Sequence, residues 1–201
     1  MENINLITSE IFISLSLMSL LILGVFKNNS SSIVYNLSIF TLLLSLLINL
    51  NLFSFNNFYL FNGAYKVDHL SNFMKVLIIV SGIFVMLSSS KYLKINKIFK
   101  IEYPILLLSS ILGMFIMISS NDLMVFYLGL ELQSLALYVL ASFKSNDQLS
   151  SESGLKYFVL SALSSGLLLY GCSLIYGFSG STNFDQISNN ISGVQYGLTL
   201  G

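Results

Sequence analysis

Long apolar stretches alternate with short polar ones along almost the whole chain. A helix of roughly 20 mostly apolar residues crosses a ~30 Å hydrocarbon core. Windows of about that length run approximately over residues 6–26, 33–55, 70–90, 103–120, 122–143 and 154–177. The pattern therefore predicts six transmembrane helices joined by polar loops.

A seventh apolar stretch, residues 191–201, follows the polar segment from Ser179 to Asn190. At ~1.5 Å per residue, a helix of this length reaches only about half the thickness of the core. We expect it to be the start of an incomplete seventh helix. Residues 1–201 are thus predicted to form a single transmembrane domain of an all-α polytopic membrane protein.

The composition agrees with a membrane protein and excludes several other classes. Hydrophobic residues make up 55% of the chain and charged residues 9%, with a mean hydropathy of +0.81. Soluble domains carry about 25% charged residues, and disordered chains need low hydrophobicity. The net charge is zero, so no nucleic-acid partner is expected. The chain has one cysteine and one histidine, too few for a disulfide framework or a zinc site.

The residue bias indicates an AT-rich genome. Every basic residue is lysine, and Pro104 is the only proline. An imported mitochondrial protein would start with an Arg-rich amphipathic segment, whereas this chain has no basic residue before Lys27. We therefore expect an organelle-encoded protein of the mitochondrial inner membrane. The alternative is a bacterial plasma membrane.

Lysine placement predicts the orientation. The loops after the first, third and fifth predicted helices carry Lys27, Lys91, Lys94, Lys97, Lys100 and Lys144. The opposite loops carry mainly acids, with Lys66 as their one lysine. The positive-inside rule therefore places the N-terminus outside, on the intermembrane-space side in a mitochondrion. A site for anionic membrane lipids is the alternative reading of the Lys91–Lys100 run.

Glu131 is the main candidate for chemistry. It lies ~12 Å into the fifth predicted helix, near the middle of the membrane. Intramembrane carboxyls are costly and usually face a bundle interior or a wet cavity. Tyr127, Ser134 and Tyr138 share its helical face. This arrangement favours a proton relay over the alternative, a structural carboxyl bonded to neighbouring helices.

Two lysines are weaker candidates. Lys156 lies near the start of the sixth predicted helix, four residues after Glu152, and either extends to the lysine-rich face or acts with Glu131. Lys75 lies early in the third predicted helix, where we expect it to pair with Asp68 or to extend toward the interface. No nucleotide-binding motif or set of heme or iron–sulfur ligands occurs, so no cofactor is expected on this chain.

Three runs resemble the subunit 2 family of respiratory complex I, the proton-translocating NADH dehydrogenase. They are YLGLELQSLALYVL (127–140), ESGLKYFVLSALSSGLLLYG (152–171) and IYGFSGSTNF (175–184). The resemblance is specific over about residues 102–187; before that, only the helix pattern and the region from Asp68 to Lys75 suggest it.

The resemblance implies an antiporter-like, proton-translocating subunit of the membrane arm, in contact with other membrane-arm subunits. Glu131 matches the family glutamate that faces a lysine of the seventh helix. Lys156 matches a lysine at the head of the sixth helix, which implies that it tunes Glu131 or the proton entry path. NADH, FMN, iron–sulfur clusters and quinone would bind elsewhere in the complex, and no redox chemistry would occur on this chain.

The chain departs from the family in length. It holds fewer than half of the family's helices and lacks the seventh-helix lysine. The chain would then be a truncated piece of the subunit, a degenerate subunit or one part of a split subunit. We favour a split subunit, whose companion chain carries the C-terminal helices. Two other functions stay open: a subunit of a cation/proton antiporter of the same fold, and a purely structural membrane-arm subunit.

Overall fold

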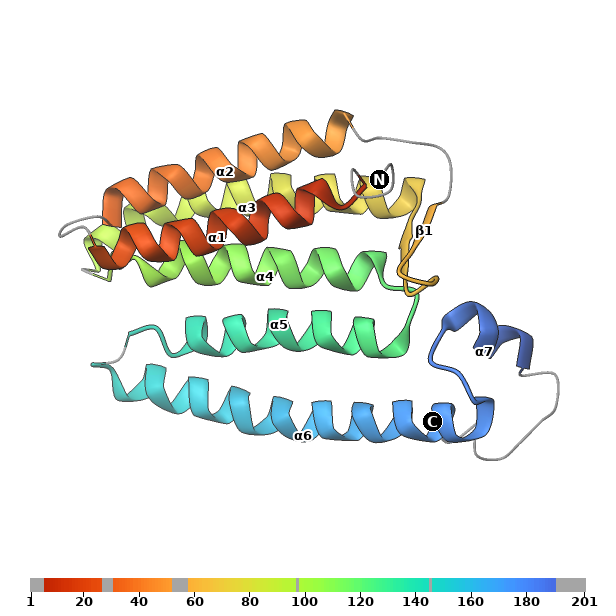
Figure 1. Cartoon of the computed structure of the whole chain (residues 1–201). Coiled ribbons are helices and arrows are strands. Elements are labelled where there is room, and N and C mark those ends of the chain that lie inside the picture. Colours follow the sequence, from red (N-terminus) through yellow and green to blue (C-terminus); the bar gives the residue numbers. More distant parts are fainter. Residues whose placement is uncertain (1–5, 27–30, 52–57, 97, 145, 191–201) are drawn as a thin grey trace.

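The computed structural model describes residues 6–26, 31–51, 58–96, 98–144 and 146–190 (Figure 1). Its helices are α1 (Thr8–Phe26), α2 (Ser31–Asn51), α3 (His69–Ile95), α4 (Glu102–Ser119), α5 (Leu123–Ala141), α6 (Gln148–Ser179) and the short α7 (Phe184–Asn190). Two short strands, β1 (Phe58–Leu60) and β2 (Tyr65–Val67), precede α3. Within these residues, α1 to α6 are each long and apolar enough to cross a membrane. The predicted all-α polytopic fold is confirmed.

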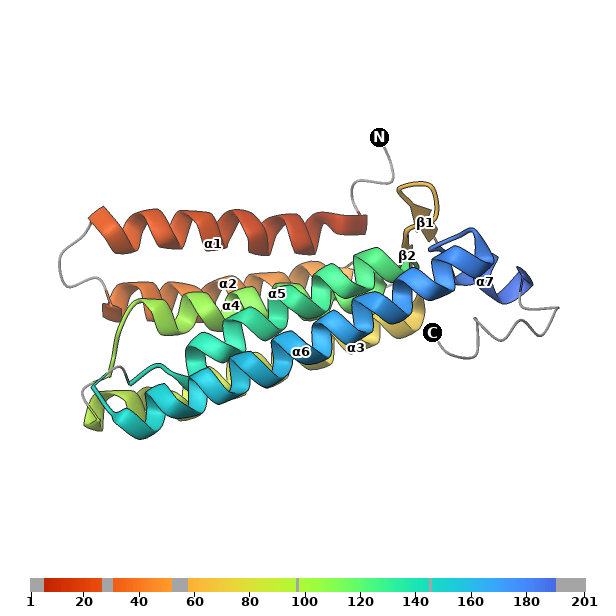
Figure 2. The same cartoon turned by 90° about the horizontal axis from the view of Figure 1, so that it is seen from below.

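Four of the six long helices, α1 to α4, form a bundle, and α5 and α6 add two further layers to it. In the bundle, α1 packs on α2 and α4, α2 packs on α3, and α3 packs on α4. Helix α5 then lies on α4, and α6 lies on α5, so that the last two helices extend the molecule to one side (Figures 1 and 2). Helix α4 is therefore the element that joins the bundle to the α5–α6 layers.

The bundle interior combines apolar side chains with small polar ones. Its fully buried apolar residues include Ile13, Leu42, Ile79, Met86, Leu108 and Phe115. Buried serines lie among them, and each donates its hydroxyl hydrogen to the carbonyl three residues earlier: Ser16, Ser38, Ser45 and Ser110. In lipid, apolar contact between helices gains nothing from excluding water, so close packing of small residues holds them together.

Two helix ends differ from the prediction. Helix α6 begins at Gln148 instead of near 154, because Asp147 caps it by accepting a 3.1 Å hydrogen bond from the Leu149 N–H. Helix α3 continues past residue 90 to Ile95, through two lysines. At 32 residues, α6 is ~48 Å long and exceeds the thickness of the hydrocarbon core.

Two segments that the sequence left as loops are ordered. Strands β1 and β2 form an antiparallel hairpin with Leu60 opposite Tyr65. Its turn has left-handed backbone at Phe61, Asn62 and Gly63, with φ of 51°, 55° and 86°, a conformation that suits asparagine and glycine best. Helix α7 lies in the polar segment after α6. The predicted start of a seventh membrane helix, 191–201, lies outside the described residues.

Helices α4 and α5 approach at backbone distance through two glycines. A Cβ atom on Gly129 would lie 2.8 Å from the Met117 backbone nitrogen and 3.0 Å from the Gly113 carbonyl oxygen. A Cβ on Gly113 would lie 2.7 Å from the backbone nitrogen of Gln133. The atoms in the way are backbone, which cannot move aside as a side chain can. Both positions therefore need glycine.

We predict that Gly129→Ala forces α4 and α5 apart and destabilises the protein by about 3 kcal/mol, the upper end of the usual cost of overpacking. Thermal unfolding of the detergent-solubilised protein measures the loss. The matched control is Gly166→Ala in α6, where nothing lies within 4 Å of the added Cβ; it should change stability by no more than about 1 kcal/mol. Equal melting temperatures for the two variants would contradict the assignment of this contact.

Candidate functional site

Glu131 lies in the middle of α5, on the side away from α4. It is two residues, or ~200° around the helix, from Gly129 at the α4 contact. The residue is half-buried, and its Oε1 atom is buried without a hydrogen-bond partner among the described residues. A buried carboxylate oxygen is costly when nothing compensates its charge. The arrangement therefore calls for a proton, a cation or water at Oε1.

Two of the three hydroxyl groups predicted to share the face of Glu131 donate elsewhere. Ser134 donates to the backbone carbonyl of Glu131, at 3.0 Å, and not to its carboxyl group. The buried Tyr138 hydroxyl donates to the Ser161 hydroxyl of α6, and its ring packs edge-on against Tyr157 of the same helix. These two hydroxyls of the predicted stripe thus tie α5 to itself and to α6.

Lys156 lies on the exposed surface of α6. Its Nζ atom is 2.5 Å from Oε1 of Glu152, one helical turn earlier, and the two side chains are 67% and 56% exposed. The pairing that the spacing suggested is therefore present. Exposed pairs of this type contribute only a few tenths of a kcal/mol.

The structure does not bring Lys156 next to Glu131. Helices α5 and α6 run antiparallel, and their register is defined by two facing pairs, Tyr138 with Ser161 and Ser142 with Gly154. This register places Lys156 level with residues near 141, about ten residues from Glu131, or roughly 15 Å along the axis. Any effect of Lys156 on Glu131 must act over that distance.

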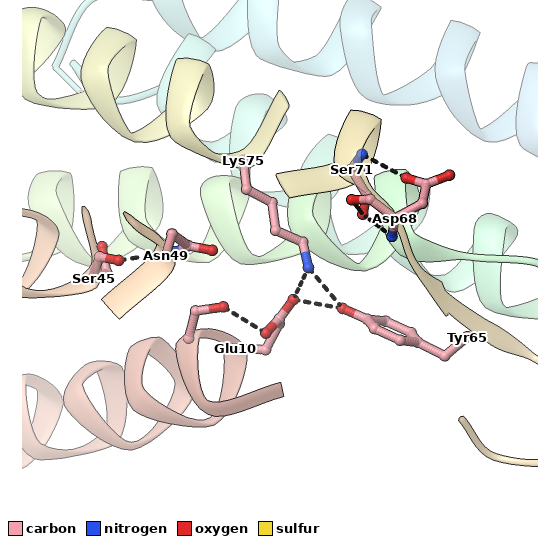
Figure 3. Close-up of polar contacts among 8 residues, drawn as sticks. Glu10, Ser45, Asn49, Tyr65, Asp68, Ser71 and Lys75 are labelled. Carbon is pink, nitrogen blue, oxygen red and sulfur yellow. Dashed lines mark hydrogen bonds and ion pairs between the residues drawn. The ribbon is translucent and has the colours of Figure 1, made fainter. Parts of the chain in front are cut away.

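A second ionisable cluster lies inside the α1–α4 bundle. Lys75 of α3 and Glu10 of α1 point toward each other, with Nζ 2.6 Å from Oε1, and their side chains are 1% and 8% exposed (Figure 3). Glu10 accepts two more hydrogen bonds, from the Tyr65 hydroxyl at 2.5 Å and from the Ser9 hydroxyl at 2.7 Å. The carboxylate is thus compensated by one cation and two hydroxyl donors.

Tyr65 brings the hairpin into this cluster. It is the first residue of β2, and its hydroxyl lies 3.4 Å from the Lys75 ammonium while it donates to Glu10. The ammonium also lies 5.5 Å from the centre of the Tyr65 ring and 6.0 Å from that of Phe115. Burial, and then the charge of Glu10 and the hydrogen bond to it, raise the pKa of Tyr65. The hydroxyl therefore keeps its proton and remains a donor.

The expected pairing of Lys75 with Asp68, or its extension to the interface, is wrong. Asp68 caps α3 instead: its Oδ1 accepts from the Ser71 N–H at 2.7 Å, and the Ser71 hydroxyl accepts from the Asp68 N–H at 2.9 Å. Its ion-pair partner is Lys66, at 3.5 Å. Burial raises the pKa of Asp68, but the Ser71 hydrogen bonds and the Lys66 ammonium outweigh it and leave the pKa below its usual value.

Sequence reasoning missed Glu10 as a site residue. It is the third residue of α1 and lies beside polar neighbours, so its local sequence does not single it out. Its partner is sixty-five positions later, and only the packing of α1 near α3 brings the two together. The available signal was that both charges lie inside predicted spans, where each needs a partner.

The turn between α4 and α5 joins the hairpin to the segment after α6. The Asn121 N–H donates to the Ala64 carbonyl of the hairpin turn, and the Asn121 side-chain amide donates to the Gly63 carbonyl, both at 2.9 Å. From the other side, Asn183 donates to the same Gly63 carbonyl at 2.9 Å, and Thr182 donates to Asp122 at 2.5 Å. Asp122 in turn caps α5, where its Oδ1 accepts a 2.8 Å hydrogen bond from the Met124 N–H.

Metal binding has no support in the part of the chain that the structure covers. Among those residues, no group of three or more histidine, cysteine, aspartate or glutamate side chains lies close enough to hold an ion.

Comparison with known proteins shows that the chain is similar to subunits of respiratory enzymes. Residues 120–200 match the family described as NADH:quinone oxidoreductase/Mrp antiporter, transmembrane region. The whole chain is 65% identical over 201 residues to NADH-quinone oxidoreductase subunit N of Pelagibacter ubique, and 45% identical over 203 residues to that of Maricaulis maris. It covers 43% and 42% of these relatives' own lengths. The expected similarity to complex I is confirmed at this level; the relatives carry the name subunit N, and not subunit 2.

Solved structures share the fold. A chain of respiratory complex I from Thermus thermophilus with bound aureothin has a TM-score of 0.75 and 24% identity, with 96% of this chain and 42% of that one covered. A chain of the membrane-bound sulfane sulfur reductase, an archaeal respiratory membrane complex, has a TM-score of 0.85 and 19% identity, covering 97% and 42%. The antiporter-like fold of α1–α6 is therefore shared by different respiratory complexes.

Proposed function

We propose that this chain is part of a proton-translocating membrane-arm subunit of an NADH:quinone oxidoreductase, complex I. The observation that carries the proposal is the Glu131 carboxyl, placed in the middle of a membrane-spanning helix with a buried oxygen that has no partner among the described residues. Similarity to subunit N over the full length of the chain supports the same function. Electron transfer from NADH to quinone would take place on other subunits.

In the proposed mechanism Glu131 takes up and releases one proton. An approaching cation stabilises the carboxylate by its charge, so a cation that moves nearer would drive the proton off. The cation would be a lysine from the region that corresponds to the uncovered part of the relatives. That region would lie on the same polypeptide or on a companion chain. Helix α6, of which only Gly154 is buried among the described residues, offers a surface beside α5 for that region.

A cation/proton antiporter is the second candidate, because the matching family description names both classes. In this alternative the same carboxyl exchanges protons against another cation, without an NADH-oxidising arm. Co-purification separates the two: a complex I subunit is isolated with NADH-oxidising activity, and an antiporter subunit is isolated without it.

We propose a bacterial plasma membrane as the location, since the relatives compared are bacterial. The mitochondrial inner membrane stays a prediction. The proposed orientation puts the N-terminus outside. It rests on the lysines that gather at the end opposite the hairpin, where Lys94 lies 5.3 Å from the ring centre of Phe99 and Lys100 lies 5.9 Å from that of Phe143.

Glu131→Gln keeps the size of the side chain and removes its ability to ionise. We expect assembly to be retained and proton transfer at this position to slow by about a hundredfold or more, the contribution of a positioned acid or base. NADH-linked proton transport in reconstituted vesicles measures the loss. Glu152→Gln, which removes an exposed carboxyl from α6, is the control and should transport normally. Normal transport by the Glu131 variant would leave only a structural role for this chain.

Lys156→Met should give a milder defect than Glu131→Gln, because roughly 15 Å along the helix axis separates the two residues and Lys156 already has Glu152 as a partner. The control is Lys144→Met, which breaks an exposed ion pair with Asp147 at the same end. Both variants are measured in the same vesicles. If the two variants transport protons equally well, Lys156 has no role in proton transfer at Glu131.

We also propose that Glu131 needs the helices found in the part of the relatives that this chain does not cover. Mass spectrometry of the intact, purified complex identifies the polypeptide that carries them. We expect either a longer form of this chain or a separate companion with a lysine inside its first membrane span. A complex that contains neither would rule out the proposed partner of Glu131.

A further inference from the structure

The Glu10–Lys75 pair is the most deeply buried charge in the part of the chain described. Lys75 is 1% exposed, and no other ion pair there is less than 25% exposed on either side chain. Both residues belong to membrane-spanning helices, and Figure 3 shows them in direct contact inside the bundle, with the Tyr65 hydroxyl beside both. Nothing in the proposed role of Glu131 uses them.

Stability alone is a poor reason for such a pair. Taking two charges out of water costs more than their mutual attraction commonly returns, and well-packed apolar residues of similar size are often as stable or more so. Apolar side chains border the pair: the Lys75 ammonium lies 6.0 Å from the ring centre of the fully buried Phe115, and Ile79, one turn along α3, is also fully buried. Intramembrane ionisable groups generally serve transport or switching.

We propose that Glu10 and Lys75 form a second functional charge site, which switches between an ion pair and a neutral pair during transport. In the switch, one proton moves from the Lys75 ammonium to the Glu10 carboxylate across the 2.6 Å contact. The N–H bond breaks and the O–H bond forms, which leaves a neutral amine and a carboxylic acid. No other reactant is needed, and the net charge of the pair stays zero.

Tyr65 connects this switch to the helix that carries Glu131. Its hydroxyl donates to the carboxylate form of Glu10, and this hydrogen bond weakens to about half its strength when Glu10 becomes neutral. Tyr65 pairs with Ser120 at the end of α4, and the adjoining Ala64 carbonyl holds the Asn121 N–H. Helix α5 begins two residues later. A change at Glu10 therefore reaches the start of α5 through hydrogen-bonded backbone.

This inference rests on the proposed function, because the switch has meaning only if Glu131 transfers protons. Tyr65 is a positioning residue in this scheme, since it acts through α5. The pair itself changes protonation state, which a merely structural ion pair does not do. That difference is measurable.

The first experiment is infrared difference spectroscopy of the whole complex during NADH turnover. We expect a band from a protonated carboxylic acid that is lost in Glu10→Gln and kept in Glu131→Gln. The control is Lys66→Gln, which removes an exposed ion pair of the same hairpin and should leave the band in place. If no carboxylic acid band depends on Glu10, the switch is overturned.

The second experiment counts protons moved per NADH oxidised in vesicles. The double variant Glu10→Leu/Lys75→Met keeps the volume and removes both charges together, which avoids leaving one unpaired. We expect assembly with a loss in the proton-to-NADH ratio. A wild-type ratio in the assembled double variant would reduce the pair to a structural contact.

Tyr65→Phe gives a decision even if the double variant fails to assemble, because it removes only the hydroxyl and keeps the ring. A lower proton-to-NADH ratio supports the link to α5, and an unchanged ratio overturns it. Glu131→Gln in the same preparations separates the proposed function of Glu131 from the proposed Glu10–Lys75 switch. If it leaves the ratio unchanged, the proposed function itself fails; if it lowers the ratio while the double and Tyr65 variants do not, only the switch fails.

Discussion

The backbone contact between α4 and α5 is the constraint on which the arrangement depends. Gly113 and Gly129 let two membrane-spanning helices touch without intervening side chains, which is how helices associate where water exclusion contributes nothing. Helix α4 belongs to the four-helix bundle, and α5 carries Glu131 and supports α6. A wider spacing at these glycines would separate α5, and with it the candidate proton site, from the four-helix bundle.

Most of the fold could be predicted from the sequence, because length and apolarity determine which segments span a membrane. The positions that could not be predicted depend on local chemistry. Asp147 caps α6 about a turn and a half before the apolar window of that helix begins. Strands β1 and β2 have three residues each, too few to give an alternating pattern in the sequence. The turn before α5 was predictable, since Asp122 caps it through a contact between near neighbours.

The candidate site was predictable only in part. Glu131 is conspicuous because one carboxyl interrupts an apolar run, so its depth follows from counting residues. The partner of Lys75 does not follow from counting, because Asp68 is nearer in the chain than Glu10 and is occupied by Ser71 and Lys66. Which charges meet inside a helical bundle depends on how the helices pack, and the apolar windows carry no information about that.

The distance along the chain between Glu10 and Lys75 also has a consequence for biosynthesis. At the usual rate of translation, about 5–20 residues per second, Lys75 leaves the ribosome roughly 3–13 s after Glu10. During that interval the first helix holds a carboxyl group without its cation, which is tolerable because Glu10 lies within the first turn of α1 and can stay at the water interface. Glu10 can therefore gain its cation only after the third helix has been inserted. The buried ion pair thus forms late in biosynthesis, after α1 is already in the membrane and α3 has joined it.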